Sequence, residues 1–122
     1  MRRVLLVDDD DDSRELLQEL FRAHGYEVQS ASNGIAALEI AASFRPEVTV
    51  LDIRLPDMDG YELAHKLRQV EGLERIRLVA LTGYDGEHAR ERSREAGIDE
   101  HLVKPITMAS LTALFDRVTG GN

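Results

Sequence analysis

The chain has 122 residues, 43% of them hydrophobic, and no cysteine, which excludes disulfide scaffolds, thiolate metal sites and cysteine nucleophiles. This length predicts one domain, residues 1–122, with a core that needs no covalent cross-link. The net charge of −8 disfavours direct nucleic-acid binding, and without a signal peptide or an apolar run of roughly 18 residues we expect a cytoplasmic protein with no membrane segment.

Short apolar runs alternate with helix-period stretches along the chain. The runs expected to form strands are 4–7, 26–29, 48–51, 78–81 and 101–103. Three of them are continuously apolar, which is typical of strands covered on both faces, whereas the second and fifth are weaker, as edge strands are. The expected helices carry apolar stripes at positions 16, 17, 20 and 21; 37, 40, 41 and 44; 63, 64 and 67; and 111, 114, 115 and 118.

Polar residues and glycines mark where the helices begin and end. Helix caps are expected at Asn33, Asp59, Asp85 and Thr107, and left-handed residues after helix ends at Gly25 and Gly97. The stretch from 85 to 96 is almost wholly polar, so this helix should bury little and be the most easily displaced element. The order β-α, repeated five times with right-handed crossovers, predicts an α/β fold with a parallel five-stranded sheet and helices on both faces.

Reactive side chains follow four of the five expected strands. Asp8 and Asp9 follow the first strand, Asp52 the third, Thr82 the fourth and Lys104 the fifth. Ligands of open parallel sheets bind beyond the carboxyl ends of the strands, so we expect these five residues to converge at one edge.

Three crowded carboxylates need a compensating charge. Hard oxygen ligands with open positions suit Mg²⁺, and Lys104 offers a positive charge to an anion. A carboxylate nucleophile, a divalent ion, an ammonium and a hydroxyl together fit phosphoryl transfer to a carboxylate, with Asp52 attacking in line.

Four segments carry a resemblance to a known family. VLLVDDDDDSRELL, VTVLDIRLPDMDGYEL, LVALTGY and HLVKPI resemble the response-regulator receiver domains of two-component signalling, and with the matching turns they cover essentially the whole chain. The resemblance implies a doubly wound, flavodoxin-like sheet with strand order 2-1-3-4-5. It also implies a signalling phosphoacceptor rather than an enzyme, with transfer from a phosphohistidine to Asp52 and slow autodephosphorylation.

The resemblance assigns roles to individual residues. Mg²⁺ would be held by Asp8, Asp9, Asp52 and the backbone carbonyl of Arg54. Thr82 would be the switch hydroxyl that moves onto the phosphoryl group. Lys104 would pair with the phosphate, and its bond to Pro105 is expected to be cis. Tyr84 and Arg54 would shield the path of the hydrolytic water.

The resemblance also implies partners. The phosphodonor would be a sensor histidine kinase or a histidine phosphotransfer protein. A downstream protein would bind the face formed by the polar helix 85–96, the strand 101–103 and the last helix, and the domain would be a monomer or a weak homodimer. His101 stands where the family usually has Tyr or Phe, a feature similar to receivers fused to hybrid sensor kinases, so the second switch residue here would be an imidazole.

Two other functions remain open at this point. Asp8 and Asp10 after the first strand also fit the nucleophile motif of an aspartyl-phosphate phosphohydrolase of the haloacid dehalogenase type. A degenerate receiver acting only as a docking module is the other alternative. The residue that carries the phosphoryl group distinguishes the first alternative from the receiver, and absence of Mg²⁺ binding would favour the second.

Overall fold

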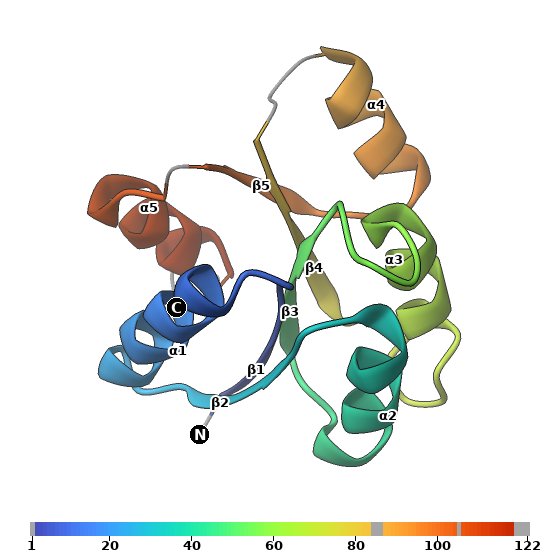
Figure 1. The fold of residues 1–122 in the computed structure, drawn as a ribbon, viewed down its shortest axis with the longest axis horizontal. Coiled ribbons are helices and arrows are strands. Elements are labelled where there is room, and N and C mark those ends of the chain that lie inside the picture. The colour runs from blue at the N-terminus through green and yellow to red at the C-terminus, as the bar shows by residue number, and fades with distance from the viewer. Residues whose placement is uncertain (1, 84–86, 105, 119–122) are drawn as a thin grey trace.

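The computed structural model of the protein describes residues 2–83, 87–104 and 106–118, and Figure 1 shows its ribbon. Strands and helices alternate throughout this part of the chain. In chain order they are β1 (Arg3–Val7), α1 (Asp11–Ala23), β2 (Glu27–Ala31), α2 (Gly34–Phe44), β3 (Val48–Asp52), α3 (Gly60–Arg68), β4 (Arg77–Thr82), α4 (Glu87–Glu95), β5 (Glu100–Val103) and α5 (Met108–Val118).

The five strands form one parallel sheet with the order β2-β1-β3-β4-β5. This confirms the predicted strand order and the prediction that the second and fifth strands lie at the edges. Helices α1 and α5 lie on one side of the sheet, and α2 and α3 lie on the other (Figure 1). The chain is therefore a doubly wound α/β fold, and β1 and β3 are direct neighbours.

Alternating residues along the strands pack into two separate hydrophobic cores, one on each face of the sheet. In β1, Val4 and Leu6 pack with residues of α1 and α5, whereas Leu5 and Val7 pack with residues of α2 and α3. All four are essentially inaccessible to solvent. Burying a large apolar side chain contributes roughly 1.5–3 kcal/mol. The central strands are thus fixed from both faces, and their carboxyl ends are held in register.

Capping residues begin three helices, at the predicted Asn33 and Asp59 and at Asp10, where no cap was predicted. The Asp10 side chain accepts hydrogen bonds from the first turn of α1, and Asn33 and Asp59 do the same for α2 and α3. Gly25 and Gly97 have positive φ angles of 88° and 80°, as expected for residues that follow a helix end. The predictions that concern Tyr84, Asp85 and Pro105 lie outside the described residues.

The structure differs from the sequence prediction at one position within α1 and at the start of β2. Leu16 was expected on the buried stripe but is 51% exposed, because Leu17 and Phe21, one turn apart, form the centre of that stripe. Strand β2 begins at Glu27 rather than at Tyr26. The amide of Tyr26 donates to the carbonyl of Phe21, so this residue closes the turn instead of joining the sheet.

Helix α4 buries few of its described side chains. Among its residues 90–95, Ser93 alone is buried, with 1% of its surface exposed. The Arg92 guanidinium lies 4.3 Å from the ring centroid of Tyr61 in α3, which is a cation–π contact. The sequence prediction of a polar, weakly packed helix is confirmed for these residues.

No helix within residues 2–83, 87–104 and 106–118 is both long and apolar enough to cross a membrane.

Candidate functional site

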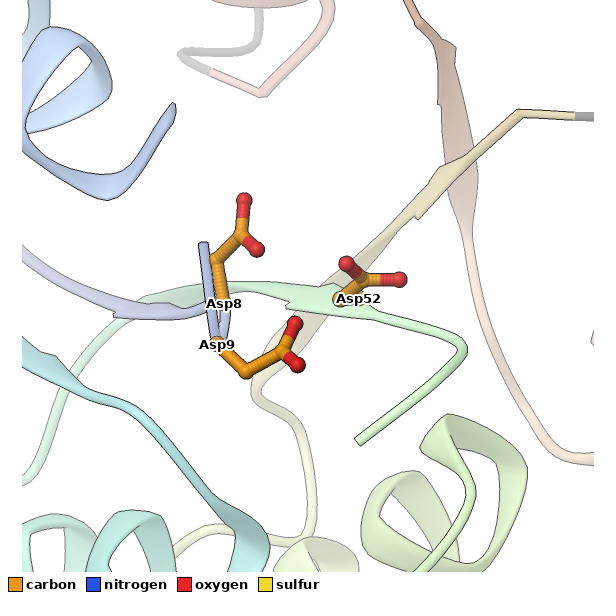
Figure 2. Close-up of side chains that lie close together, drawn as sticks. All are labelled: Asp8, Asp9 and Asp52. Atoms are coloured by element: carbon orange, nitrogen blue, oxygen red, sulfur yellow. The ribbon is translucent and has the colours of Figure 1, made fainter. Parts of the chain in front are cut away.

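Three carboxylates meet at the carboxyl ends of β1 and β3. Asp52 is the last residue of β3, and Asp8 and Asp9 directly follow β1. One oxygen from each of the three lies within 4.8 Å of the others. In Figure 2 Asp8 and Asp9 lie side by side at the end of β1, and the Asp9 side chain extends towards the end of β3 that carries Asp52. The predicted convergence of these three acids is therefore present, and it follows directly from the pairing of β1 with β3.

Asp8 is the most deeply buried of the three, with 1% of its surface exposed. Its Oδ1 accepts a hydrogen bond of 3.0 Å from the backbone amide of Asp10. Its Oδ2 is buried and has no hydrogen-bond partner, although the Nζ of Lys104 lies 3.8 Å away. A buried carboxylate oxygen without a hydrogen bond is unfavourable unless a cation compensates it. This oxygen is therefore well suited to be a metal ligand.

The two oxygens of Asp52 have different partners. Its Oδ1 accepts a 3.0 Å hydrogen bond from the backbone amide of Arg54, and its Oδ2 accepts one of 3.1 Å from the Nζ of Lys104. The residue is 8% exposed. Asp52 is thus oriented by its own loop on one side and by an ammonium on the other. The predicted coordination by the carbonyl of Arg54 stays a prediction, although its amide is at the site.

Lys104 supplies the positive charge that the sequence analysis required. Burial alone would lower the pKa of its ammonium, but the hydrogen bond to Asp52 and the charges of Asp52, Asp8 and Asp10 more than offset this and raise the pKa above its usual value. Lys104 is therefore protonated throughout the neutral range. Its backbone amide donates a 2.8 Å hydrogen bond to the carbonyl of Thr82, which fixes the β5 end beside the β4 end.

The two predicted switch residues lie on the neighbouring strands β4 and β5. Thr82 is the last residue of β4, and it pairs in the sheet with Val103. His101 lies in β5, half-buried, and its Nε2 is 2.7 Å from the Oγ of the buried Ser93 in α4. The site edge is thus connected through β5 to the weakly packed helix α4.

The donor set fits a magnesium ion. Mg²⁺ binds oxygen ligands at about 2.0–2.1 Å in octahedral geometry, which separates its ligands by about 3–4 Å. The three carboxylate oxygens, within 4.8 Å of one another, need only small rotations to reach such spacings. Asp9 would bind the ion on its solvent-exposed side, and the unpartnered Oδ2 of Asp8 would bind it on its buried side.

Gly60 allows the close approach of α3 to the site, a role that the sequence analysis did not assign. A Cβ at this position would lie 2.5 Å from the carbonyl oxygen of Asp52 and 2.7 Å from the Cα of Ile53. The amide of Gly60 donates a 2.7 Å hydrogen bond to the carbonyl of Ile53. Only glycine lets the first turn of α3 pack against the backbone that carries Asp52.

We expect Gly60→Ala to destabilise the fold by about 1–3 kcal/mol, because the added methyl group must displace backbone rather than a flexible side chain. Urea unfolding measures this change directly. Gly83→Ala is the matched control, since a Cβ there meets nothing within 4 Å, and its effect should stay within about 0.5 kcal/mol. Equal stability of the two variants would contradict the close-approach role of Gly60.

Asp57 anchors the loop between β3 and α3, and sequence reasoning also missed this role. Its two carboxylate oxygens accept hydrogen bonds of 2.8 Å and 2.9 Å from the amides of Gly34 and Ile35 in the first turn of α2. These bonds lower the pKa of Asp57. Their contribution to stability is therefore present above the usual carboxyl pKa and is lost as the pH falls through the lowered value. Asp57 thus links the loop that follows Asp52 to α2.

Comparisons with known proteins identify a family. The model of the family described as the response regulator receiver domain matches residues 4–116. Sporulation initiation phosphotransferase F of Bacillus subtilis is 36% identical over 104 residues, which are 85% of this chain and 82% of that protein. The chain also spans about half the length of mycobacterial response regulators MprA, with 38% identity over 111 residues for the Mycobacterium ulcerans protein.

Solved structures agree with this family. The chemotaxis protein CheY4 of Vibrio cholerae superposes with a TM-score of 0.92 at 29% identity, covering 97% of this chain and 98% of that chain. The receiver domain of sensor histidine kinase PA1611 from Pseudomonas aeruginosa superposes with a TM-score of 0.87 at 31% identity, covering 98% of each chain. That structure holds a magnesium ion coordinated in its active site cleft.

Proposed function

Because this chain belongs to the response regulator receiver domain family of two-component signalling, we propose that Asp52 is its phosphoacceptor and that the transfer depends on Mg²⁺. The observation that carries the proposal is the position of Asp52 at the end of β3, within 4.8 Å of two further carboxylates and hydrogen-bonded to Lys104 at 3.1 Å. A relative with magnesium coordinated in its cleft supports the choice of metal.

The proposed step is a phosphoryl transfer between two side chains. A carboxylate oxygen of Asp52 attacks the phosphorus of a phosphohistidine on the partner protein, the P–N bond breaks, and the freed imidazole nitrogen takes a proton. The product is an acyl phosphate on Asp52, which water later hydrolyses slowly. Mg²⁺ held by Asp8, Asp9, Asp52 and the Arg54 carbonyl would supply positive charge beside the phosphoryl oxygens.

Lys104 and Thr82 would bind the oxygens of the new phosphoryl group. In this proposal the ammonium of Lys104 leaves Asp52 Oδ2 and pairs with a phosphoryl oxygen, and the Thr82 hydroxyl moves onto another. His101 lies on the strand between this site and α4, and its hydrogen bond to Ser93 makes it the proposed second switch residue. The output is then a population shift of the α4-β5-α5 face, where a downstream protein would bind.

Several finer expectations stay predictions. These are the cognate sensor histidine kinase or histidine phosphotransfer protein, a hybrid-kinase parent, the monomeric or weakly dimeric state and the cytoplasmic location. Direct binding of nucleic acid or membrane is not part of the proposed role.

Locating the phosphoryl group tests the proposed function. The protein is incubated with Mg²⁺ and acetyl phosphate, the acyl phosphate is reduced with borohydride, and the modified residue is found by peptide mass spectrometry. We expect one modification, at Asp52, that depends on Mg²⁺. Modification at Asp8 instead would favour a phosphohydrolase of the haloacid dehalogenase type. A chain that is not modified and does not bind Mg²⁺ would favour a docking module.

A further inference from the structure

Arg14, in the first turns of α1, makes two contacts at the edge of the acidic site. Its Nη1 donates a 2.8 Å hydrogen bond to the backbone carbonyl of Asp8, and its Nη2 lies 2.5 Å from Oδ1 of Asp11. The Arg14 side chain is 18% exposed, whereas that of Asp11 is 80% exposed. One guanidinium therefore joins the turn after β1 to the beginning of α1.

The carbonyl of Asp8 belongs to the peptide group that leads into Asp9. The other groups of Asp8 are also restrained, since its amide donates to the carbonyl of Ala31 at 3.1 Å and its Oδ1 accepts from the amide of Asp10. The Arg14 contact thus fixes the plane of the Asp8–Asp9 peptide. That plane determines the direction in which the exposed Asp9 side chain leaves the backbone.

We propose that Arg14 is a positioning residue, which holds the Asp8–Asp9 peptide so that both carboxylates face the same metal ion. This inference rests on the proposed function, because it concerns the Mg²⁺ that the function requires. Arginine suits the task because its planar fork can reach a carbonyl and a carboxylate at once from two different nitrogens, whereas a lysine ammonium carries its three donors on a single nitrogen.

The charge of Arg14 and its positioning role predict opposite effects of its removal on Mg²⁺ affinity. The guanidinium of Arg14, bonded to the Asp8 carbonyl at the edge of the acidic site, repels a divalent cation, so a purely electrostatic role predicts that its removal strengthens Mg²⁺ binding. A positioning role predicts that its removal weakens Mg²⁺ binding, because the two acids are no longer aligned. The direction of the change in Kd therefore separates the two roles.

The test compares Mg²⁺ affinities of the whole chain by calorimetric titration. We expect Arg14→Ala to raise the Kd about tenfold, as is typical when a group that orients a metal ligand is removed, and Arg14→Lys to give an intermediate value. The matched control is Arg22→Ala in the last turn of the same helix, where the arginine contacts Gln18 instead; its Kd should stay unchanged.

A second readout does not involve the metal. In the metal-free protein, Arg14→Ala should shift the backbone amide resonances of Asp9 and Asp10, while the rest of the spectrum shows an intact fold. An unchanged or lower Kd for Arg14→Ala would overturn the positioning role while leaving the proposed function standing. A wild-type chain that does not bind Mg²⁺ at all would overturn both.

Discussion

Asp52→Asn is expected to abolish phosphorylation by acetyl phosphate while leaving the fold intact. The amide is nearly the same size as the carboxylate, and its oxygen can still accept the hydrogen bond from the Arg54 amide. It is not a nucleophile, however, so labelling should fall by at least about a thousandfold in rate. The measurement is the Mg²⁺-dependent incorporation of phosphoryl label, followed by intact-protein mass spectrometry.

The same substitution has a second expected result, on stability. Removing one of three crowded charges relieves repulsion, and Lys104 retains Asp8 as a neighbour at 3.8 Å. The free energy of unfolding without metal should therefore stay the same or rise. Asp57→Asn is the matched control for labelling, because it makes the same chemical change in an acid that bonds α2 instead of the site, and it should be labelled as the wild type is. Undiminished labelling of Asp52→Asn would refute the assignment of the phosphoacceptor.

Lys104→Ala is expected to preserve phosphorylation of Asp52 but to weaken the conformational change that follows it. The three carboxylates and the metal site proposed for them remain, so the variant should still be labelled. The ammonium that lies 3.1 Å from Asp52 Oδ2 is lost, so the pull on the end of β5 is lost with it. We expect the amide shift changes of Ser93 and His101 on addition of beryllofluoride to fall about tenfold or more, as two-dimensional NMR would show.

The control for this experiment is Lys66→Ala, which removes a lysine whose exposed partner Glu62 lies 3.8 Å away in the same helix α3. The Lys66→Ala variant should respond to beryllofluoride as the wild type does.

Because the pKa of Lys104 is raised, the stability that Lys104 contributes is complete below its usual pKa and is lost only as the pH rises through the raised value. The contribution of Lys104 to the response should therefore be insensitive to pH near neutrality. A full shift change in Lys104→Ala would contradict the proposed role.

Much of this site could be predicted from the sequence because its residues follow directly from strand ends. A short apolar run ending in Asp52 or Asp8 places the acid at the edge of a parallel sheet, whichever details the loops adopt. Lys104 after the last strand is placed by the same rule. The fold was predictable for a related reason, since each strand and each helix stripe is a local pattern in the chain.

The remaining residues depend on contacts between distant segments. Asp57 caps a helix that begins 23 residues earlier, and the need for glycine at position 60 appears only when α3 meets the backbone of Asp52. Ser93 gives no sequence signal in a polar helix until β5 brings His101 to it. Leu16 shows the reverse error, because periodicity alone does not fix the centre of a stripe within one residue.

Ser93 is the one buried residue among residues 90–95 of α4, so little burial opposes a displacement of this part of the helix. A helix held by two or three large buried side chains would resist displacement by roughly 1.5–3 kcal/mol for each. The bond between Ser93 and His101 contributes about 1 kcal/mol, and each 1.4 kcal/mol changes a population ratio tenfold. Under the proposed function, a few contacts to a phosphoryl group on Asp52 would be enough to invert the balance between two positions of α4, and a partner protein would need only modest affinity to favour one of them.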